Sequence, residues 1–271
     1  MPVVTIDGQP LHYLDQGEGE VVVLGSSYLW DSAMWAAQIN VLSQRYRVIV
    51  PELWGHGQSG RLPENTRSLD DLANQVLALL DRLDIQRFSL VGLSVGGMWG
   101  ARLALAAPQR IRGLVLMDTY AGAEPEATRQ YYFSMLKMIE DAGSIPPPLL
   151  DAIVPIFFKS GIDPETPFYQ AFRHSLTRYS REQLLDSIVP LGRLIFGRDD
   201  RLAALAALPA ETTLVLCGEQ DKPRPPSEAR EMAEIIGCPY IGIPEAGHIS
   251  SVENPACVNQ ALLAFLEKLP G

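Results

Sequence analysis

The sequence predicts an α/β protein whose mostly parallel sheet has eight strands and carries an inserted helical cap. Short runs of apolar and β-branched residues alternate with helical segments in the first half of the chain and again near its end. Repeated β-α-β units of this kind build a parallel sheet that helices cover on both faces. Between residues 120 and 208 the strand-like runs stop, and helical periodicity interrupted by prolines replaces them.

The predicted strands differ in character along the chain. The first two flank Asp7-Gly8, a dipeptide that favours a tight turn, so we expect them to form a hairpin. The third is a solid apolar run, which is typical of a strand buried on both faces. In order, the predicted strands span residues 3–6, 11–15, 21–24, 47–51, 88–93, 111–118, 212–217 and 239–243.

Helical segments lie between these strands. A long one begins at Ser68-x-x-Asp71, a spacing that favours a helix N-terminus, and apolar residues then recur on one face. Pro108 ends the helix that follows the fifth strand. The other predicted helices span residues 34–42, 95–107, 227–236 and 253–266.

The break in the pattern divides the chain into two parts. Residues 1–119 and 209–271 form the predicted core, and residues 120–208 form a helical cap over the carboxyl edge of the sheet. Ligands of open α/β sheets bind at that edge, so we expect the cap to cover a binding site. The cap is rich in aromatic residues that could line it, namely Tyr131, Tyr132, Phe133, Phe157, Phe158, Phe168, Tyr169 and Phe172.

Composition excludes several classes of protein. Hydrophobic residues make up 47% of the 271 positions and charged residues 20%, which is ordinary for a globular chain. The net charge is −10 and no basic run occurs, which argues against a nucleic-acid partner. No apolar run reaches the ~18 residues of a membrane span, and the N-terminus does not resemble a secretory signal. The three cysteines form no metal-binding pattern, and their odd number fits a reducing compartment. We therefore expect a cytoplasmic protein without a bound metal.

The strongest motif is Gly92-Leu93-Ser94-Val95-Gly96, a G-x-S-x-G pattern. It joins a predicted buried strand to a predicted helix, which is the context that a nucleophile elbow requires. In such a turn the small residues on either side of the serine let the backbones pass closely, and the serine Oγ points out at the top of the sheet. A glycine-rich strand–helix turn of a nucleotide site is the alternative, but the dinucleotide pattern G-x-G-x-x-G is absent here.

A nucleophilic serine needs a base and a carboxylate that orients the base. Of the four histidines, His248 follows the last predicted strand and is the expected base. His56 is expected to be structural, and His174 to lie on the surface of the cap. Asp221 follows the seventh strand and is the expected carboxylate, in the order Ser…Asp…His. Asp118 and Glu219 are the competing candidates.

These motifs in this order resemble the α/β-hydrolase superfamily over essentially the whole chain. The matching pieces are the elbow, the turn Gly55-His56-Gly57-Gln58-Ser59, the segment that ends at Asp221, and Ala246-Gly247-His248. The resemblance implies the α/β-hydrolase fold with Ser94, Asp221 and His248 as a catalytic triad. Around the elbow, the chain is similar to the 3-oxoadipate enol-lactonase and aryl esterase branches.

The resemblance also implies an oxyanion hole and a substrate pocket. Many relatives carry His-Gly after the third strand, where this chain has Ser26-Ser27, and Tyr28 then supplies one backbone N–H. Val95 N–H is the expected second donor. Ser27 either adds a hydroxyl contact or is a turn residue. The expected substrate-binding residues are Ser27, Trp30, Trp54 and Met98. Arg173 and Arg129 are candidates for binding a substrate carboxylate, or are solvated surface residues.

The predicted function is therefore hydrolysis of a small carboxylic ester or lactone through an acyl-enzyme on Ser94, with no cofactor and no metal. The expected partner is the small-molecule substrate, without nucleic acid or membrane, and a homodimer remains open. One alternative is a carbon–carbon bond hydrolase of vinylogous diketones. Another is a ligand-sensing protein on the same fold, because fold alone does not determine function.

Overall fold

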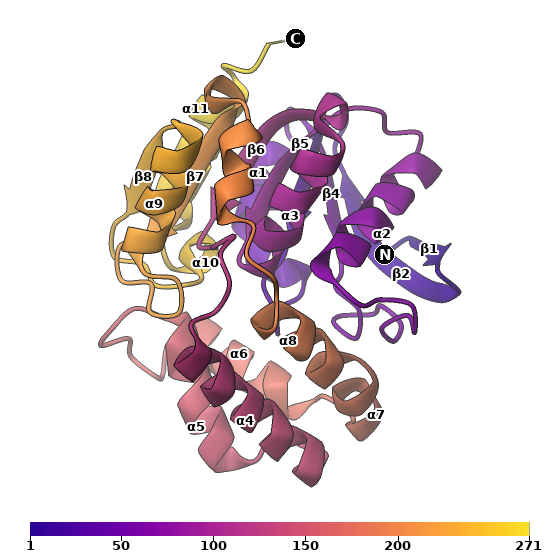
Figure 1. The fold of residues 1–271 in the computed structure, drawn as a ribbon, viewed down its shortest axis with the longest axis vertical. Coiled ribbons are helices and arrows are strands. Elements are labelled where there is room, and N and C mark those ends of the chain that lie inside the picture. The colour runs from indigo at the N-terminus through magenta and orange to yellow at the C-terminus, as the bar shows by residue number, and fades with distance from the viewer. Residues whose placement is uncertain (271) are drawn as a thin grey trace.

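The computed structural model describes residues 1–270, which contain one eight-stranded sheet (Figure 1). Its strands follow the order β1-β2-β4-β3-β5-β6-β7-β8. Each predicted strand is present, and its ends differ from the prediction by at most two residues. The strands are β1 (Val3–Ile6), β2 (Gln9–Gln16), β3 (Val21–Gly25), β4 (Arg47–Pro51), β5 (Phe88–Leu93), β6 (Ile111–Met117), β7 (Thr213–Gly218) and β8 (Tyr240–Ile243).

The sheet is mostly parallel, as predicted. Only the β1–β2 and β2–β4 pairs are antiparallel, and the neighbours from β4 to β8 run parallel. The register places Gly25 of β3 beside Gly92 of β5. The carboxyl ends of β3, β5, β7 and β8 therefore lie along one edge of the sheet, where their loops can meet.

Helices pack on the two faces of the sheet in separate groups. One group consists of α2 (Leu69–Arg82), α3 (Val95–Ala106) and α9 (Pro226–Ile236), and the other of α1 (Ala36–Leu42), α10 (Ser250–Glu253) and α11 (Pro255–Leu266). The Ser68 side chain caps α2 by accepting from Asp71 N, which agrees with the predicted start. The segment predicted as one helix over 253–266 is divided, because Asn254 ends α10 and its side chain caps α11.

Five helices stand beyond the carboxyl edge of the sheet, where the cap was predicted (Figure 1). They are α4 (Glu126–Ala142), α5 (Pro147–Ile153), α6 (Pro167–Thr177), α7 (Arg181–Gln183) and α8 (Val189–Phe196). The last turn of the insertion, Leu202–Ala207, is different, since it packs against α3 and α9 of the core. The described helices that cover the edge are therefore α4 to α8.

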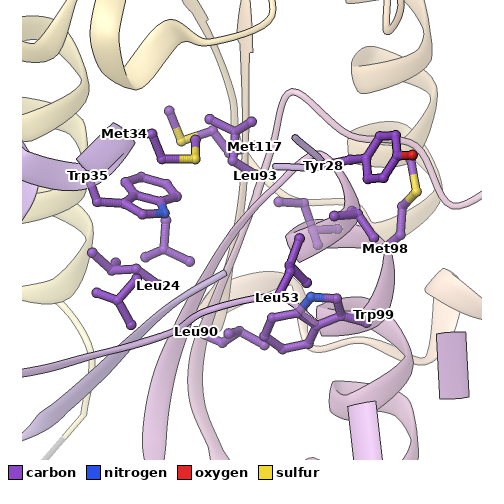
Figure 2. Packing of buried hydrophobic residues seen from close by; sticks show 14 of the residues in the cluster. Leu24, Tyr28, Met34, Trp35, Leu53, Leu90, Leu93, Met98, Trp99 and Met117 are labelled. Atoms are coloured by element: carbon purple, nitrogen blue, oxygen red, sulfur yellow. The ribbon is translucent and has the colours of Figure 1, made fainter. Parts of the chain in front are cut away.

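The core of the protein surrounds the central strands. Trp35 and Trp99 are almost completely buried and lie on opposite sides of the strands, as Figure 2 shows. Leu24 of β3 and Leu90 of β5 are fully buried between them. Burial of both faces fixes the positions of the strand ends, and hence of the loops that follow them. Within residues 1–270, none of the helices combines the length and apolar character that crossing a bilayer requires.

Candidate active site

Ser94 occupies a strained turn between β5 and α3. Its backbone has φ 56° and ψ −120°, a conformation that residues with a side chain rarely adopt. A Cβ atom added at Gly92 would lie 2.3 Å from Gly96 O, and one added at Gly96 would lie 2.2 Å from Gly25 O. Only glycine fits at these two positions, because the clashing atoms belong to backbone. The turn thus has the geometry that the G-x-S-x-G pattern predicts.

The structure brings Ser94, His248 and Asp221 together. His248 Nε2 lies 3.0 Å from Ser94 Oγ, and His248 Nδ1 lies 2.9 Å from Asp221 Oδ2. All three are buried, with at most 8% of each residue exposed. An ionised carboxylate only accepts hydrogen bonds, so Nδ1 must donate to Asp221. That tautomer leaves Nε2 free to accept the proton of the Ser94 hydroxyl.

The loops that carry His248 and Asp221 hold each other by backbone contacts. Gln220 N donates to Ala246 O at 2.9 Å, and Glu219 N donates to Ile243 O at 3.0 Å. Within the His248 segment, the Glu253 side chain accepts from Gly247 N at 2.7 Å. Asp221 Oδ1 also accepts from Arg224 N at 2.9 Å. With both carboxylate oxygens bonded, the Asp221 side chain has a fixed orientation toward the imidazole.

Asp118, the competing acid, is buried next to Asp221 but does not contact a histidine. Its Oδ1 accepts from Gly218 N at 2.7 Å, and its Oδ2 accepts from the Ser250 hydroxyl. Burial, and then the charge of Asp221, raises the pKa of the Asp118 carboxyl well above its usual range. Asp118 thus connects the loop after β7 to the helix that follows His248. Glu219 has only its backbone in this network, since its N–H donates to Ile243 O at 3.0 Å.

Three residues next to the triad could in principle bind a metal ion. Potential ligand atoms of Asp118, Cys217 and Asp221 lie within 4.8 Å of one another, and all three residues are buried. However, both carboxylates already accept two hydrogen bonds from protein donors. Burial raises the pKa of the Cys217 thiol, which disfavours the thiolate that metal binding needs. The donor set therefore fits a hydrogen-bond network better than a metal site.

Of the two residues expected to supply oxyanion donors, Val95 follows Ser94 directly and Tyr28 lines the same cavity as Ser94. Val95 is the first residue of α3, and N–H groups in the first turn of a helix have no acceptor within the helix. Tyr28 N–H, in the loop after β3, donates to no acceptor within residues 1–270. The Tyr28 side chain reaches the cap, where its hydroxyl donates to Ile188 O at 2.6 Å. Both backbone donors are thus available to a ligand.

His56 forms a hydrogen bond with the loop after β3, which contains Tyr28. Its Nδ1 lies 2.9 Å from Trp54 O, and its Nε2 accepts from Leu29 N at 2.9 Å. Burial lowers the pKa of His56 to about 4, so the ring is neutral at neutral pH and can accept this bond. The structural role expected for His56 agrees with these contacts. His174 is exposed on α6, and His12 lies in β2.

A cavity of about 80 Å³ extends from Ser94 and His248 toward the cap. Of the expected substrate-binding residues, Ser27 and Met98 line it, and so does Tyr28. The cap contributes mainly aliphatic side chains, together with Tyr132 and Phe157 of the eight aromatic candidates. The lining residues from the cap helices and their connections are Tyr132, Met135, Leu136, Ile139, Ile153, Ile156, Phe157, Ile195 and Phe196.

Two expected substrate-binding residues lie elsewhere. Trp54 is buried within the loop after β4, where its Nε1 donates to Gln75 Oε1 at 2.8 Å. Trp30 stacks on Phe172 with ring centroids 4.1 Å apart and lines a separate surface hollow. Neither borders the cavity of Ser94, so both assignments are wrong. Each tryptophan is held by a structural contact that the sequence did not reveal.

The two arginine candidates lie outside the cavity, which agrees with the alternative that they are surface residues. Arg129 pairs with Glu126 on the surface, and Arg173 pairs with Asp151 at 2.7 Å. The cavity wall instead contains Glu124 and Arg224, which sequence reasoning missed. The position of Arg224, three residues after Asp221 in a loop at the sheet edge, was the available signal.

Comparisons with known proteins agree with this architecture. A family model described as alpha/beta hydrolase fold matches residues 20–142. A dihydrolipoyllysine-residue acetyltransferase component of an acetoin cleaving system from Pseudomonas putida is 30% identical over 97% of this chain and 68% of its own length. An esterase from Thermogutta terrifontis is 28% identical with a TM-score of 0.86, and 99% of each chain is covered. An enol-lactonase from Burkholderia xenovorans is 27% identical with a TM-score of 0.84, over 98% of this chain and 100% of that one.

The fold, the family model and these relatives define the class of protein: it is a hydrolase. The chain belongs to the α/β-hydrolase superfamily.

Proposed function

We propose that the protein is a serine hydrolase that cleaves a small carboxylic ester or lactone through an acyl-enzyme on Ser94. The observation that carries the proposal is the continuous hydrogen-bonded path from Ser94 Oγ through the His248 ring to Asp221. The similarity to an esterase and an enol-lactonase supports the choice of ester or lactone.

In the first half of the reaction, Ser94 Oγ attacks the substrate carbonyl carbon while its proton moves to His248 Nε2. Asp221 stabilises the imidazolium that forms. The Tyr28 and Val95 N–H groups donate to the negative oxygen of the tetrahedral intermediate, an interaction that contributes about 3 kcal/mol per donor in other hydrolases. When the carbon–oxygen bond breaks, the leaving alkoxide takes the proton from Nε2.

In the second half, water replaces the alcohol. His248 Nε2 removes one proton from the water as its oxygen attacks the acyl carbon. Collapse of the second intermediate breaks the bond to Ser94 Oγ, which regains its proton from Nε2. The product is a carboxylic acid, and the three residues return to their starting protonation states.

The cavity supports a substrate of modest size with an apolar part. At about 80 Å³ it is small, which limits the size of the substrate part that it can hold. Aliphatic side chains of the cap, such as Leu136 and Ile139, offer no hydrogen-bonding groups and favour a hydrocarbon portion of the substrate.

Replacement of the nucleophile tests the proposal. Ser94→Ala is expected to lower kcat for p-nitrophenyl acetate by about 10³-fold or more, because no other group lies where Oγ attacks. The variant should keep the circular dichroism spectrum and melting temperature of the wild type within a few degrees. Ser251→Ala is a matched control, since Ser251 is also buried but lies outside the cavity.

The outcomes separate the proposal from its rivals. Turnover by Ser94→Ala at the wild-type rate would refute the mechanism. Rapid labelling of Ser94 by a fluorophosphonate with no multiple turnover of any ester or lactone would instead indicate a ligand-sensing protein. Turnover of a vinylogous diketone with esters barely touched would indicate a carbon–carbon bond hydrolase.

A further inference from the structure

One part of the cavity wall is charged, although the rest is apolar. Glu124 and Arg224 line the cavity together with Ser94 and His248. Only 6% of Glu124 and 4% of Arg224 is exposed. Buried charges are costly unless paired, so the contacts of these side chains show what the wall offers to a ligand.

Glu124 has no free oxygen for a ligand. Its Oε1 accepts from Arg198 Nη1 at 2.8 Å, and its Oε2 accepts from Arg224 Nη2 at 2.7 Å. Arg198 lies behind Glu124, outside the cavity wall. The single carboxylate is therefore shared between two guanidinium groups.

Arg224, in contrast, keeps one donor nitrogen unused. Its Nε donates to Pro223 O and lies 3.5 Å from Glu228 Oε2, and its Nη2 is bound to Glu124. Its Nη1 is buried and has no hydrogen-bond partner within residues 1–270. An unpaired buried donor on a charged group costs free energy that a ligand acceptor would recover.

The groups around Arg224 leave its Nη1 without an acceptor. Arginine stays protonated, and Arg224 is the positively charged side chain among the described residues that line the cavity. Glu124 is bound to Arg224 Nη2, and both oxygens of Asp221 are bonded elsewhere, to His248 and to the Arg224 backbone. Burial raises the pKa of Glu228 to about 7, which weakens its pairing with Arg224 at neutral pH.

The geometry points to Arg224 Nη1 as a binding site for an ionised carboxyl group of the substrate. This carboxyl group is separate from the ester or lactone carbonyl that Ser94 attacks. This inference rests on the proposed hydrolase function and narrows the substrate to an ester or lactone that keeps a free carboxylate, such as a monoester of a dicarboxylic acid or an acyl ester of a hydroxy acid. Arg224 would position the substrate, since the reacting atoms lie at Ser94.

Matched pairs of substrates test the inference on the whole protein. Monoethyl esters of succinic, glutaric and adipic acid are compared with ethyl esters in which an isopropyl group replaces the carboxylate. Acetate esters of ω-hydroxy acids and their isopropyl counterparts place the same groups on the leaving side. We expect kcat/KM to favour the carboxylate member of at least one pair by about 10- to 100-fold, as expected for a charged hydrogen bond. Acid release in a pH-stat gives the rates.

Variants then assign the preference to one side chain. Arg224→Gln should reduce the ratio of the two kcat/KM values to near one, and Arg224→Lys should retain part of it. Arg198→Gln is the matched comparison, because it removes the other partner of Glu124 but leaves the residues that line the cavity in place, so it should lower the ratio clearly less than Arg224→Gln does. If Arg224→Gln fails to fold, the wild-type ratio and the Arg224→Lys variant still decide.

Several results would overturn the inference. One is a wild-type ratio near one for every pair, and another is an equal loss of the ratio in Arg224→Gln and Arg198→Gln. Equal turnover of ethyl succinamate and monoethyl succinate would show that charge is not recognised. Absence of Ser94-dependent turnover for all esters would instead refute the proposed function itself.

Discussion

The two walls of the cavity are built in different ways. On the sheet side, backbone contacts around Ser94, His248 and Asp221 leave little freedom, and a single added methyl group at Gly96 would collide with the neighbouring strand. On the cap side, the wall consists of side chains such as Leu136 and Ile139 from helices that touch the core at a limited number of points. Tyr28 joins the two sides through its bond to Ile188.

This difference separates catalysis, which depends on the sheet side, from substrate preference, which depends mainly on the cap side. Chemistry requires atoms held within a few tenths of an ångström, and backbone geometry at strand ends provides that. Substrate preference requires only a volume and a few polar groups, which side chains on helices can change without disturbing the triad. With the exception of Arg224, changes on the sheet side should therefore alter mainly rate and stability, whereas changes on the cap side should alter substrate choice.

The largest expected effect concerns the two buried carboxylates on the sheet side. Asp221→Asn should lower kcat by about 10⁴-fold, because an amide can donate to Nδ1 and stabilise the wrong tautomer of His248. Asp118→Asn should lower kcat by less than about tenfold, because its amide oxygen can accept from Gly218 N and its amide nitrogen can donate to Ser250 Oγ. Steady-state kinetics with p-nitrophenyl acetate measures both.

Equal losses in the two variants would contradict this assignment and make Asp118 an essential part of the acid network. A larger loss in Asp118→Asn would exchange their roles. Thermal melting of both variants serves as the control, because each removes a buried carboxylate of similar exposure.

A smaller effect, on stability, compares two glycines. In Gly96→Ala the new methyl group would lie 2.2 Å from Gly25 O, so strand β3 or helix α3 must shift, at a cost of about 3 kcal/mol. Gly161 in the cap has φ +71° and nothing within 4 Å of the added atom. Gly161→Ala should therefore cost only about 1 kcal/mol, from the left-handed backbone alone. Urea unfolding of both variants gives the two free energies, and equal values would refute the contrast.

The same contrast explains what the sequence could predict. The triad could be predicted because each member follows a strand that an apolar run in the sequence marks. These residues are Ser94, Asp221 and His248, and each comes shortly after its strand. The carboxyl ends of parallel strands meet at one edge of the sheet, so the three were expected to lie together. The parallel sheet follows from the same runs. Trp30 and Trp54 were misplaced because the direction of a side chain in a loop depends on tertiary partners, here Phe172 and Gln75.

The lining of the cap was harder to predict, because residues from several helices and their connections contribute to it. Some of the aromatic residues of the cap were expected to pack and a few to line the pocket, but the sequence did not say which. Most of them pack on one another, as Phe158 does with Tyr169 at 5.2 Å between ring centroids. The Arg198–Glu124–Arg224 cluster joins residues 74 and 100 positions apart in the chain. No local pattern marks such a cluster, since each residue alone resembles an ordinary surface charge.

The smallest expected effect tests the cap side with two truncations of similar burial. Ile139 on α4 lines the cavity, whereas Leu150 on α5 does not, and each is 3% exposed. Both Ile139→Ala and Leu150→Ala should lower stability by about 2–4 kcal/mol, because each leaves a void in packed surroundings. Only Ile139→Ala enlarges the space next to the substrate. It should therefore raise kcat/KM for p-nitrophenyl hexanoate relative to the acetate by about tenfold, the effect of a few methylene contacts. An equal change of this hexanoate-to-acetate ratio in Leu150→Ala would contradict the prediction. The preference for acyl chain length would then depend on the stability and motion of the cap, and not on the shape of the cavity.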